Sequence, residues 1–258
     1  MKALILLLFM SMLLVFGCSK QNSPFEPDMG VTNQETVENT SLSKKSLIKV
    51  FRSAQTITID GLETEWVDVP KNTMRKYIDV TSPIDGRKDL SGYFRILWDD
   101  DNLYVFAKIL DSEINVNGAE LYERDGIEIY LDGDNSKTVA SGPPSVFPPP
   151  AYDGNDDFIR FIPYEANPFG TWGIYDVSNY EFAFLRTSKG WNFELKMPFS
   201  DLPAFQAQAG HVFGLEVQVN DNDQDQRQNF LKWYSVIDDS WFNPSLFGTA
   251  VLFKAVAE

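Results

Sequence analysis

Apolar residues recur at every second position through most of the chain, and this alternation is the feature that most constrains its fold. Successive side chains of a β-strand point to opposite faces, so a period of two predicts strands with one buried face. No helix of three turns stands out. We expect strands over Tyr93–Trp98, Leu103–Ile109, Gly126–Leu131, Phe158–Ile162, Phe182–Arg186, Asn192–Met197, Phe213–Asn220, Phe230–Val236 and Thr249–Phe253.

The segments between these strands are short and rich in Gly, Asp, Asn and Pro, as is typical of an all-β protein. Asp99–Asn102 separates two of them and predicts a hairpin turn. The spacing favours two packed antiparallel sheets, that is, a β-sandwich with Greek-key or jelly-roll-like connections. Residues 142–150 are proline-rich and cannot donate a full set of ladder hydrogen bonds, so we expect a surface loop there.

Residues 1–17 have the order of an export signal. Lys2 precedes an uncharged, mostly apolar run from Ala3 to Phe16, which is too short for a comfortable membrane span. The run ends at Gly17 and Cys18, and a small residue before a cysteine resembles the lipobox of bacterial lipoproteins, where the cysteine is lipidated. An ordinary secretory signal with an incidental cysteine is the alternative. We expect export and a lipid anchor in the bacterial cell envelope, at the outer membrane, in the periplasm or at the cell surface.

Cys18 is the only cysteine, which excludes an internal disulfide. Residues 18–46 are rich in Ser, Thr, Asn, Gln and Glu and bury too little apolar surface to fold, so they are expected to be a flexible linker. Residues 47–258 are expected to form one domain, because about 210 residues can bury a sizeable core.

The formal net charge is −15 at pH 7, and removal of residues 1–17, whose one charged side chain is Lys2, lowers it to −16. Nucleic-acid binding needs clustered Lys and Arg, and the basic pair Lys44-Lys45 falls in the linker. We therefore expect no nucleic-acid partner. Strong acidity suits a neutral ligand or bound divalent cations.

Few catalytic centres are open to this chain. His211 is the only histidine, and neither a phosphate-binding loop nor a GxSxG elbow is present. Paired carboxylates could hydrolyse a glycoside, but no pair stands out in so acidic a chain. A haem- or electron-transfer-associated sandwich using Met197 and His211 is a second alternative. A surface interaction lipoprotein without a ligand pocket is a third.

Three aromatic residues, Tyr122, Trp172 and Trp241, fall in turn-rich segments where a core role is less natural. The C–H face of a pyranose packs on a flat ring, and its hydroxyls need directional donors and acceptors. Rings flanked by charged and amide side chains therefore suit a sugar. The alternative is that each ring belongs to a small satellite core.

An ordered set of short motifs resembles family 9 carbohydrate-binding modules. The resemblance spans about residues 57–252, and no single motif is specific by itself. The motifs are Ile59-Asp60-Gly61 with Trp66, Leu97-Trp98-Asp99 with Leu103-Tyr104-Val105, Asp125 to Ile129, Gly190-Trp191 with Glu194 and Pro198, Gly214 with Val217 to Asp221, Trp233, and Ser240 to Gly248.

The resemblance implies a non-catalytic sandwich in which two aromatic rings clamp a terminal sugar of a xylan- or cellulose-like chain, in support of polysaccharide catabolism. Trp241 matches one ring, and Tyr122 falls where the family usually has a tryptophan, so the clamp would be smaller. Glu128, Arg160 and Gln218 align with positions that bind sugar hydroxyls. From the residues alone, Glu128 and Arg160 could equally form a cross-strand ion pair.

The same family is associated with calcium, usually structural, which oxygen ligands would bind. Asp132 and Asp134 are the candidate ligands. Their loop begins like an EF-hand, but Lys137 stands at the turn-glycine position and Pro143 at the closing glutamate position. Residues 221–225 form another acidic loop.

Overall fold

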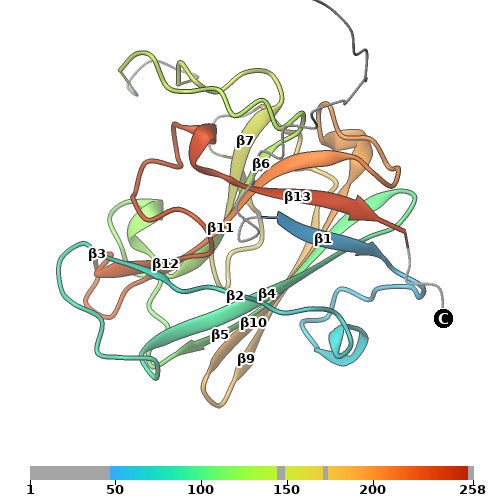
Figure 1. Ribbon diagram of the computed structural model, residues 1–258. Coiled ribbons are helices and arrows are strands. Elements are labelled where there is room, and N and C mark those ends of the chain that lie inside the picture. Colours follow the sequence, from blue (N-terminus) through green and yellow to red (C-terminus); the bar gives the residue numbers. More distant parts are fainter. Residues whose placement is uncertain (1–46, 144–148, 171–173, 255–258) are drawn as a thin grey trace, which may run out of the picture. The chain divides into compact units, whose positions relative to one another are not determined.

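The structure, a computed structural model, describes residues 47–143, 149–170 and 174–254 (Figure 1). The expected export signal over 1–17, Cys18 and the linker over 18–46 lie outside the described residues. So do Trp172 and part of the proline-rich loop. Among the described helices, none is both long and apolar enough to cross a membrane.

The described residues are almost entirely strands and connecting turns, which confirms the all-β class. Four single-turn 3₁₀ helices are present: η1 (Thr64–Trp66), η2 (Leu121–Glu123), η3 (Phe199–Asp201) and η4 (Pro244–Leu246). The strands are β1 (Leu47–Arg52), β2 (Asn72–Thr73), β3 (Lys76–Asp79), β4 (Leu90–Trp98), β5 (Asn102–Asp111), β6 (Gly126–Asp132), β7 (Asp156–Phe161), β8 (Phe169–Gly170), β9 (Glu181–Thr187), β10 (Gly190–Pro198), β11 (Val212–Asp221), β12 (Asn229–Lys232) and β13 (Gly248–Phe253).

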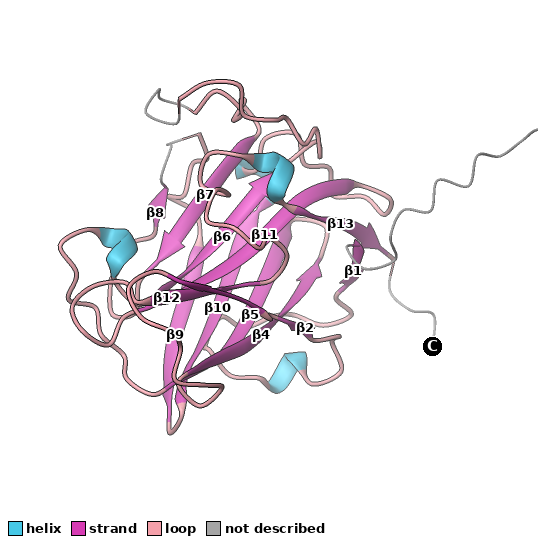
Figure 2. Cartoon of the chain, turned by 60° about the vertical axis from the view of Figure 1, so that its left-hand side comes forward, coloured by secondary structure: helices cyan, strands magenta, loops and turns pink. Residues whose placement is uncertain are grey.

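Hydrogen bonds link the strands in the order β8-β7-β6-β11-β13-β1-β4-β5-β10-β9, with β12 beside β11, β3 beside β12 and β2 beside β4. The path turns at β1, which pairs with β13 over five residues but with β4 over only two. The strands on the two sides of β1 are therefore two layers of a sandwich, which can be followed in Figures 1 and 2.

β1 corrects the expectation of a purely antiparallel sandwich, because it runs parallel to both β13 and β4. The other described pairs are antiparallel, including the expected β4–β5 hairpin. No short turn joins β1 to either neighbour, so nothing local forces it to run antiparallel.

The core lies between the layers and follows the period of two. Ile127, Ile129 and Leu131 point inward from β6, and Val105, Ala107 and Ile109 point inward from β5, all fully buried in one apolar cluster. The intervening residues of both strands lie on the outer faces. What covers each outer face then decides its role.

The outer face of the β4–β5–β10 layer is covered by the chain itself around Leu97, Tyr104 and Phe106. Trp66 of η1 is fully buried against Phe106 of β5, with ring centroids 5.6 Å apart. Glu194 of β10 accepts hydrogen bonds from Trp66 Nε1 (2.7 Å) and from the backbone amides of Asp60 (3.0 Å) and Gly61 (2.8 Å). The Asp60-Gly61, Trp66 and Glu194 motifs thus fasten this covering segment.

β12 ends earlier than the alternation predicts, at Lys232 instead of Val236. Glu216 of β11, fully buried, accepts hydrogen bonds from the backbone amides of Trp233 and Tyr234 (both 3.0 Å) and Ser235 (2.6 Å). The Trp233 amide also bonds the Val217 carbonyl of β11 at 3.0 Å, so the ladder is left after Trp233, where the carboxylate takes the Tyr234 and Ser235 amides and turns the chain away from the sheet.

Candidate functional site

The outer face of the β6–β7–β11 layer carries a row of polar side chains. Arg160 of β7 lies opposite Glu128 of β6, Glu128 opposite Gln218 of β11, and Gln218 opposite Lys232 of β12. Antiparallel pairing places such residues side by side on one face. The three polar residues singled out from the sequence therefore stand next to one another.

Glu128 is the centre of this row and is 1% exposed. Its Oε1 accepts hydrogen bonds from Arg160 Nε (2.7 Å) and Asn220 Nδ2 (2.8 Å), and its Oε2 accepts from the Tyr130 hydroxyl and Gln218 Nε2 (3.4 Å). Burial opposes its ionisation, but the Arg160 charge and these hydrogen bonds outweigh burial and hold the pKa of Glu128 below its usual range. The carboxylate is therefore ionised and fully engaged by protein groups.

A pocket of about 420 Å³ opens above this row. All five residues that we associated with sugar binding, namely Tyr122, Trp241, Glu128, Arg160 and Gln218, line it, together with Tyr130, Phe158, Arg227 and Asp238. Its size is that of a small-ligand site, with aromatic walls and a few polar groups at one end. The sequence thus located the residues of one cavity, and their roles in binding stay predictions.

Tyr122 reaches the pocket from η2 and is 44% exposed. The segment that carries Tyr122 is fixed to its neighbours by Asp125, which accepts hydrogen bonds from the backbone amides of Asn115 (2.6 Å) and Asn222 (2.7 Å). Asn222 also donates its side-chain amide to the Glu123 carbonyl at 2.7 Å. The loop that follows β11 therefore fixes the position of Tyr122.

Trp241 reaches the pocket from the segment between β12 and η4, as one of the partly buried rings around Tyr130 and Phe158. Its neighbour Ser240 is fully buried and accepts two hydrogen bonds. Lys232 Nζ donates to its hydroxyl oxygen and the Tyr152 hydroxyl donates to its carbonyl oxygen, both at 2.7 Å. A side chain anchored in this way is pre-organised for a ligand.

Arg227 and Asp238 line the pocket but were not predicted. They form an ion pair at 3.0 Å, and the Arg227 guanidinium carbon lies 5.4 Å from the Tyr122 ring centroid. Both stand in irregular segments, where periodicity gives no signal. Tyr130 and Phe158 were also missed, although they lie two residues from Glu128 and Arg160 and the period of two places them on the same face.

The residues of the haem alternative do not support it. Met197 is fully buried in the apolar core on β10. The His211 ring packs near Phe205 and Phe213, with centroids 5.3 and 6.1 Å away. The two side chains thus sit in different surroundings, and the thioether of Met197 is enclosed by hydrocarbon.

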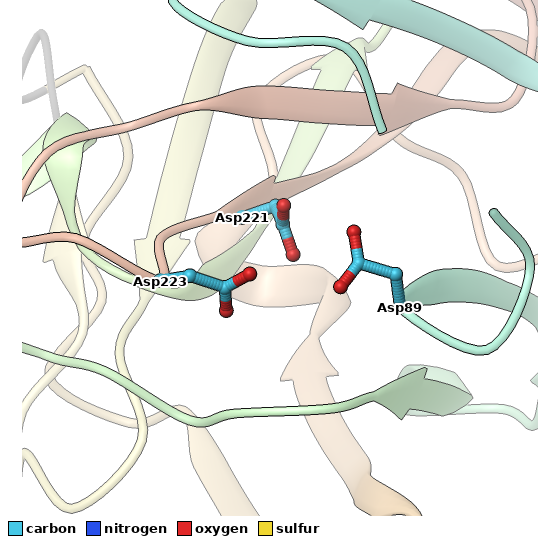
Figure 3. Close-up of side chains that lie close together, drawn as sticks. All are labelled: Asp89, Asp221 and Asp223. Carbon is cyan, nitrogen blue, oxygen red and sulfur yellow. The ribbon is translucent and has the colours of Figure 1, made fainter. Parts of the chain in front are cut away.

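A cluster of three aspartates lies at the loop after β11. Carboxylate oxygens of Asp89, Asp221 and Asp223 all lie within 4.8 Å of one another, and the three side chains point toward a shared space (Figure 3). Asp221 is 1% exposed, and within the part of the chain that the structure describes its Oδ2 has no hydrogen-bond partner. Burial and the charges of Asp223 and Asp111 raise the pKa of Asp221 to about 8.

This arrangement fits a hard cation, because carboxylate oxygens converge on one point and two of them, Asp221 Oδ2 and Asp223 Oδ1, are buried without a donor among the described residues. Asp132 and Asp134, the ligands expected from the sequence, fit less well. Asp132 accepts hydrogen bonds from the backbone amides of Ser136 (3.1 Å) and Lys137 (3.0 Å), and Asp134 accepts from Ser136 at 2.9 Å. Their oxygens are occupied in closing the turn.

Comparison with known proteins points to one family. The family model described as carbohydrate family 9 binding domain-like matches residues 59–255. Endo-1,4-beta-xylanase A of Thermoanaerobacterium saccharolyticum is 27% identical over 83% of this chain and 18% of the xylanase. Endo-1,4-beta-xylanase A of Thermotoga neapolitana is 29% identical over 65% of this chain and 14% of the xylanase. The chain thus spans less than a fifth of either relative's length.

Solved structures give the same result. A carbohydrate-binding module of family 9 from Caldicellulosiruptor kristjanssonii, in complex with cellotriose, superposes with a TM-score of 0.65 and 25% identity, covering 82% of this chain and 96% of that module. A protein from Bacteroides uniformis shares the fold at 11% identity, with a TM-score of 0.51 and 80% of this chain covered. The similarity covers nearly all the described residues.

Proposed function

The chain belongs to the carbohydrate family 9 binding-domain family, and from that premise we propose that its pocket binds chain ends of a cellulose- or xylan-like polysaccharide without cleaving them. Tyr122 and Trp241 would hold the two faces of a terminal sugar. Arg160 and Gln218 would meet its hydroxyls. Such a protein would keep the bacterial envelope in contact with a polysaccharide that separate enzymes degrade.

The observation that carries this proposal is the placement of two aromatic side chains, from separate loops, over one buried polar row. Among the described residues, the only hydrogen bond from the guanidinium of Arg160 uses Nε, which leaves its terminal nitrogens for a ligand. Glu128 has no such spare capacity, because both its oxygens already accept two hydrogen bonds. We therefore assign Glu128 to positioning Arg160 and Gln218.

One observation favours the glycosidase alternative: two carboxylates, Glu128 and Asp238, line the same pocket. Each carboxylate is bound to an arginine, Glu128 to Arg160 at 2.7 Å and Asp238 to Arg227 at 3.0 Å. Burial raises the pKa of Asp238, but a glycosidase also needs a second carboxylate with an oxygen free for water or the sugar, and both oxygens of Glu128 already accept two hydrogen bonds. We expect no release of reducing sugar from cello- or xylo-oligosaccharides.

Isothermal titration tests the proposal. The purified protein is titrated with cello- and xylo-oligosaccharides, each in native form and after borohydride reduction. Saturable heat from the native sugars that vanishes after reduction supports binding of the reducing end. Equal heats from both forms would move the contact to the chain interior, and no heat from any sugar would refute the proposal.

We also propose that Asp89, Asp221 and Asp223 hold a structural calcium ion. The ion would neutralise the mutual repulsion of the carboxylates and stiffen the loop through which Asn222 positions the Tyr122 segment. At a calcium concentration of 100 times the dissociation constant, linkage predicts about 2.7 kcal/mol of added stability. Thermal unfolding with calcium and with chelator should differ in the wild type and coincide in Asp221→Asn. Equal midpoints in the wild type would argue against the ion.

Anchoring through Cys18 is a further part of the proposal, supported by the order of residues 1–18 in the sequence. Lipidation would hold the domain at the bacterial envelope on the 18–46 tether. Expressed in a bacterium, the wild type should sediment with membranes, and Cys18→Ala should appear in the soluble fraction. Soluble wild-type protein would leave only the secretory alternative.

A further inference from the structure

A groove lined by cations begins on the outer face of β4 and β5, beside Ser91 and Tyr93, and continues past the end of β5 to the β9–β10 turn, away from the pocket. One part, of about 900 Å³, has Lys71, Arg75, Arg87 and Lys88 in its lining, and an adjoining part of about 460 Å³ has Arg186 and Lys189. Lys88 and Leu110 line both parts, so the two are continuous. We call the whole the basic groove.

Seven cations line the basic groove, and Lys108, which pairs with Glu63 at 2.8 Å, is the only one of them in an ion pair among the described residues, so the six named above keep their charge for a ligand. Lys108 is one of seven Lys and Arg side chains of the described residues that form ion pairs, whereas none of these six does. The lining includes one carboxylate, Asp111, which is 4% exposed and accepts from Trp191 Nε1 at 2.9 Å. In a chain with a net charge of −15, such a concentration of unpaired positive charge is unexpected.

The groove also offers surfaces that suit a sugar. Tyr93 lies in its lining, with Lys71 Nζ 4.4 Å from the ring centroid. Ser91 and Gly92 form part of the floor on β4, and the β9–β10 turn closes the far part. Cations spread along an elongated groove match a polymer with repeated, separated anionic groups, whereas a single small anion would use only one end.

We propose that the basic groove binds a polysaccharide bearing uronic-acid carboxylates. Duplex nucleic acid carries one negative charge per about 1.7 Å of its axis, and the chain's overall negative charge repels so dense a polyanion, whereas a single polyuronate chain carries at most one charge per sugar. A concave groove suits a linear chain, and the headgroup plane of a membrane is flat. This site is separate from the pocket, so it stands or falls independently of the proposed function.

The test uses the full chain and galacturonate oligosaccharides, with their methyl esters as neutral counterparts. The wild type should bind the free acids, more weakly as salt rises, and should not bind the esters in this groove. Arg87→Gln/Lys88→Gln should bind the acids roughly fivefold more weakly, since exposed charge contacts contribute up to about 1 kcal/mol each. Lys49→Gln/Lys254→Gln removes the same charge from exposed sites outside the groove and should bind as the wild type does.

Trp241→Ala, which alters only the pocket, should leave galacturonate binding unchanged. The proposal is overturned if the free acids do not bind, if both double variants lose equal affinity, or if the loss appears in Trp241→Ala instead. It is also overturned if phosphatidylglycerol vesicles, and not galacturonates, bind in a manner that depends on Arg87 and Lys88.

Discussion

Two buried glutamates stand at matching places in the two layers of the sandwich, and the chain uses them differently. Glu194 lies on the outer face of one layer. Its oxygens accept hydrogen bonds from Trp66 and from the backbone amides of Asp60 and Gly61, and these bonds fasten a covering segment. Glu128 lies on the outer face of the other layer. Its oxygens accept hydrogen bonds from neighbouring side chains of the same sheet.

The difference shows how one architecture makes a closed face and an open one. Where a glutamate accepts hydrogen bonds from main-chain amides, the loop that carries those amides packs onto the sheet and buries the face around the glutamate. Where it captures side chains of its own sheet, the polar row stays in place and a pocket remains above it. Stability should therefore depend on the Glu194 side and ligand binding on the Glu128 side.

The largest effect should come from Trp66→Ala. Removing a fully buried tryptophan costs about 3–5 kcal/mol and should lower the denaturation midpoint strongly, while the folded protein keeps its sugar affinity. Val67→Ala, at the exposed neighbouring position, is the control and should change little. If Trp66→Ala lost sugar affinity at full stability, the division between the two faces would be wrong.

Glu128→Gln should come next and act on both properties. It leaves the buried Arg160 without its counter-charge, and breaking a buried pair in this way costs about 3 kcal/mol. Sugar affinity should fall as well, because Arg160 and Gln218 lose their common acceptor. Glu181→Gln is the matched control, since its pair with Lys196 is exposed and such pairs contribute no more than about 1 kcal/mol. Equal destabilisation by both variants would count against the account.

Trp241→Ala should weaken sugar binding by about 2 kcal/mol, or roughly 30-fold, as expected for an aromatic anchor at the centre of a site. Its denaturation midpoint should fall less than that of Trp66→Ala, because Trp241 is only partly buried. Trp241→Phe should recover part of the affinity. Titration calorimetry and denaturant unfolding of the same samples separate the two effects, and unchanged affinity in Trp241→Ala would remove this ring from the site.

The smallest effect is a difference in the sign of the pH dependence. The pKa of Glu128 is lowered, so its contribution to stability is present above about pH 4.3, the unfolded value, and is lost as pH falls through the folded value. Burial raises the pKa of Glu194, so its contribution is greatest below about pH 4.3 and falls as pH rises through the folded value.

The destabilisation by Glu128→Gln should therefore shrink from pH 7 to pH 3, and that by Glu194→Gln should grow. Denaturant unfolding of both variants across this range measures the two slopes. Parallel slopes would mean that the two carboxylates share one environment.

Alternation predicted the central strands, whereas Glu128, Arg160 and Gln218 were singled out by the resemblance to family 9 modules, and the period of two agrees with their outward faces. It could not predict the parallel direction of β1, which depends on how the first and last strands meet. The acidic loop over residues 221–225 was noted in the sequence, but its meeting with Asp89 could not be predicted, because Asp89 lies far away in the chain and approaches the loop only through the fold. Arg227 was missed because its loop has no regular period.

A crystal structure of the protein soaked with cellotriose tests the central claim most directly. The account predicts a terminal glucose ring between Tyr122 and Trp241, with hydroxyls hydrogen-bonded to Arg160 and Gln218. Density for the sugar at another surface, with this pocket holding only water, would contradict it.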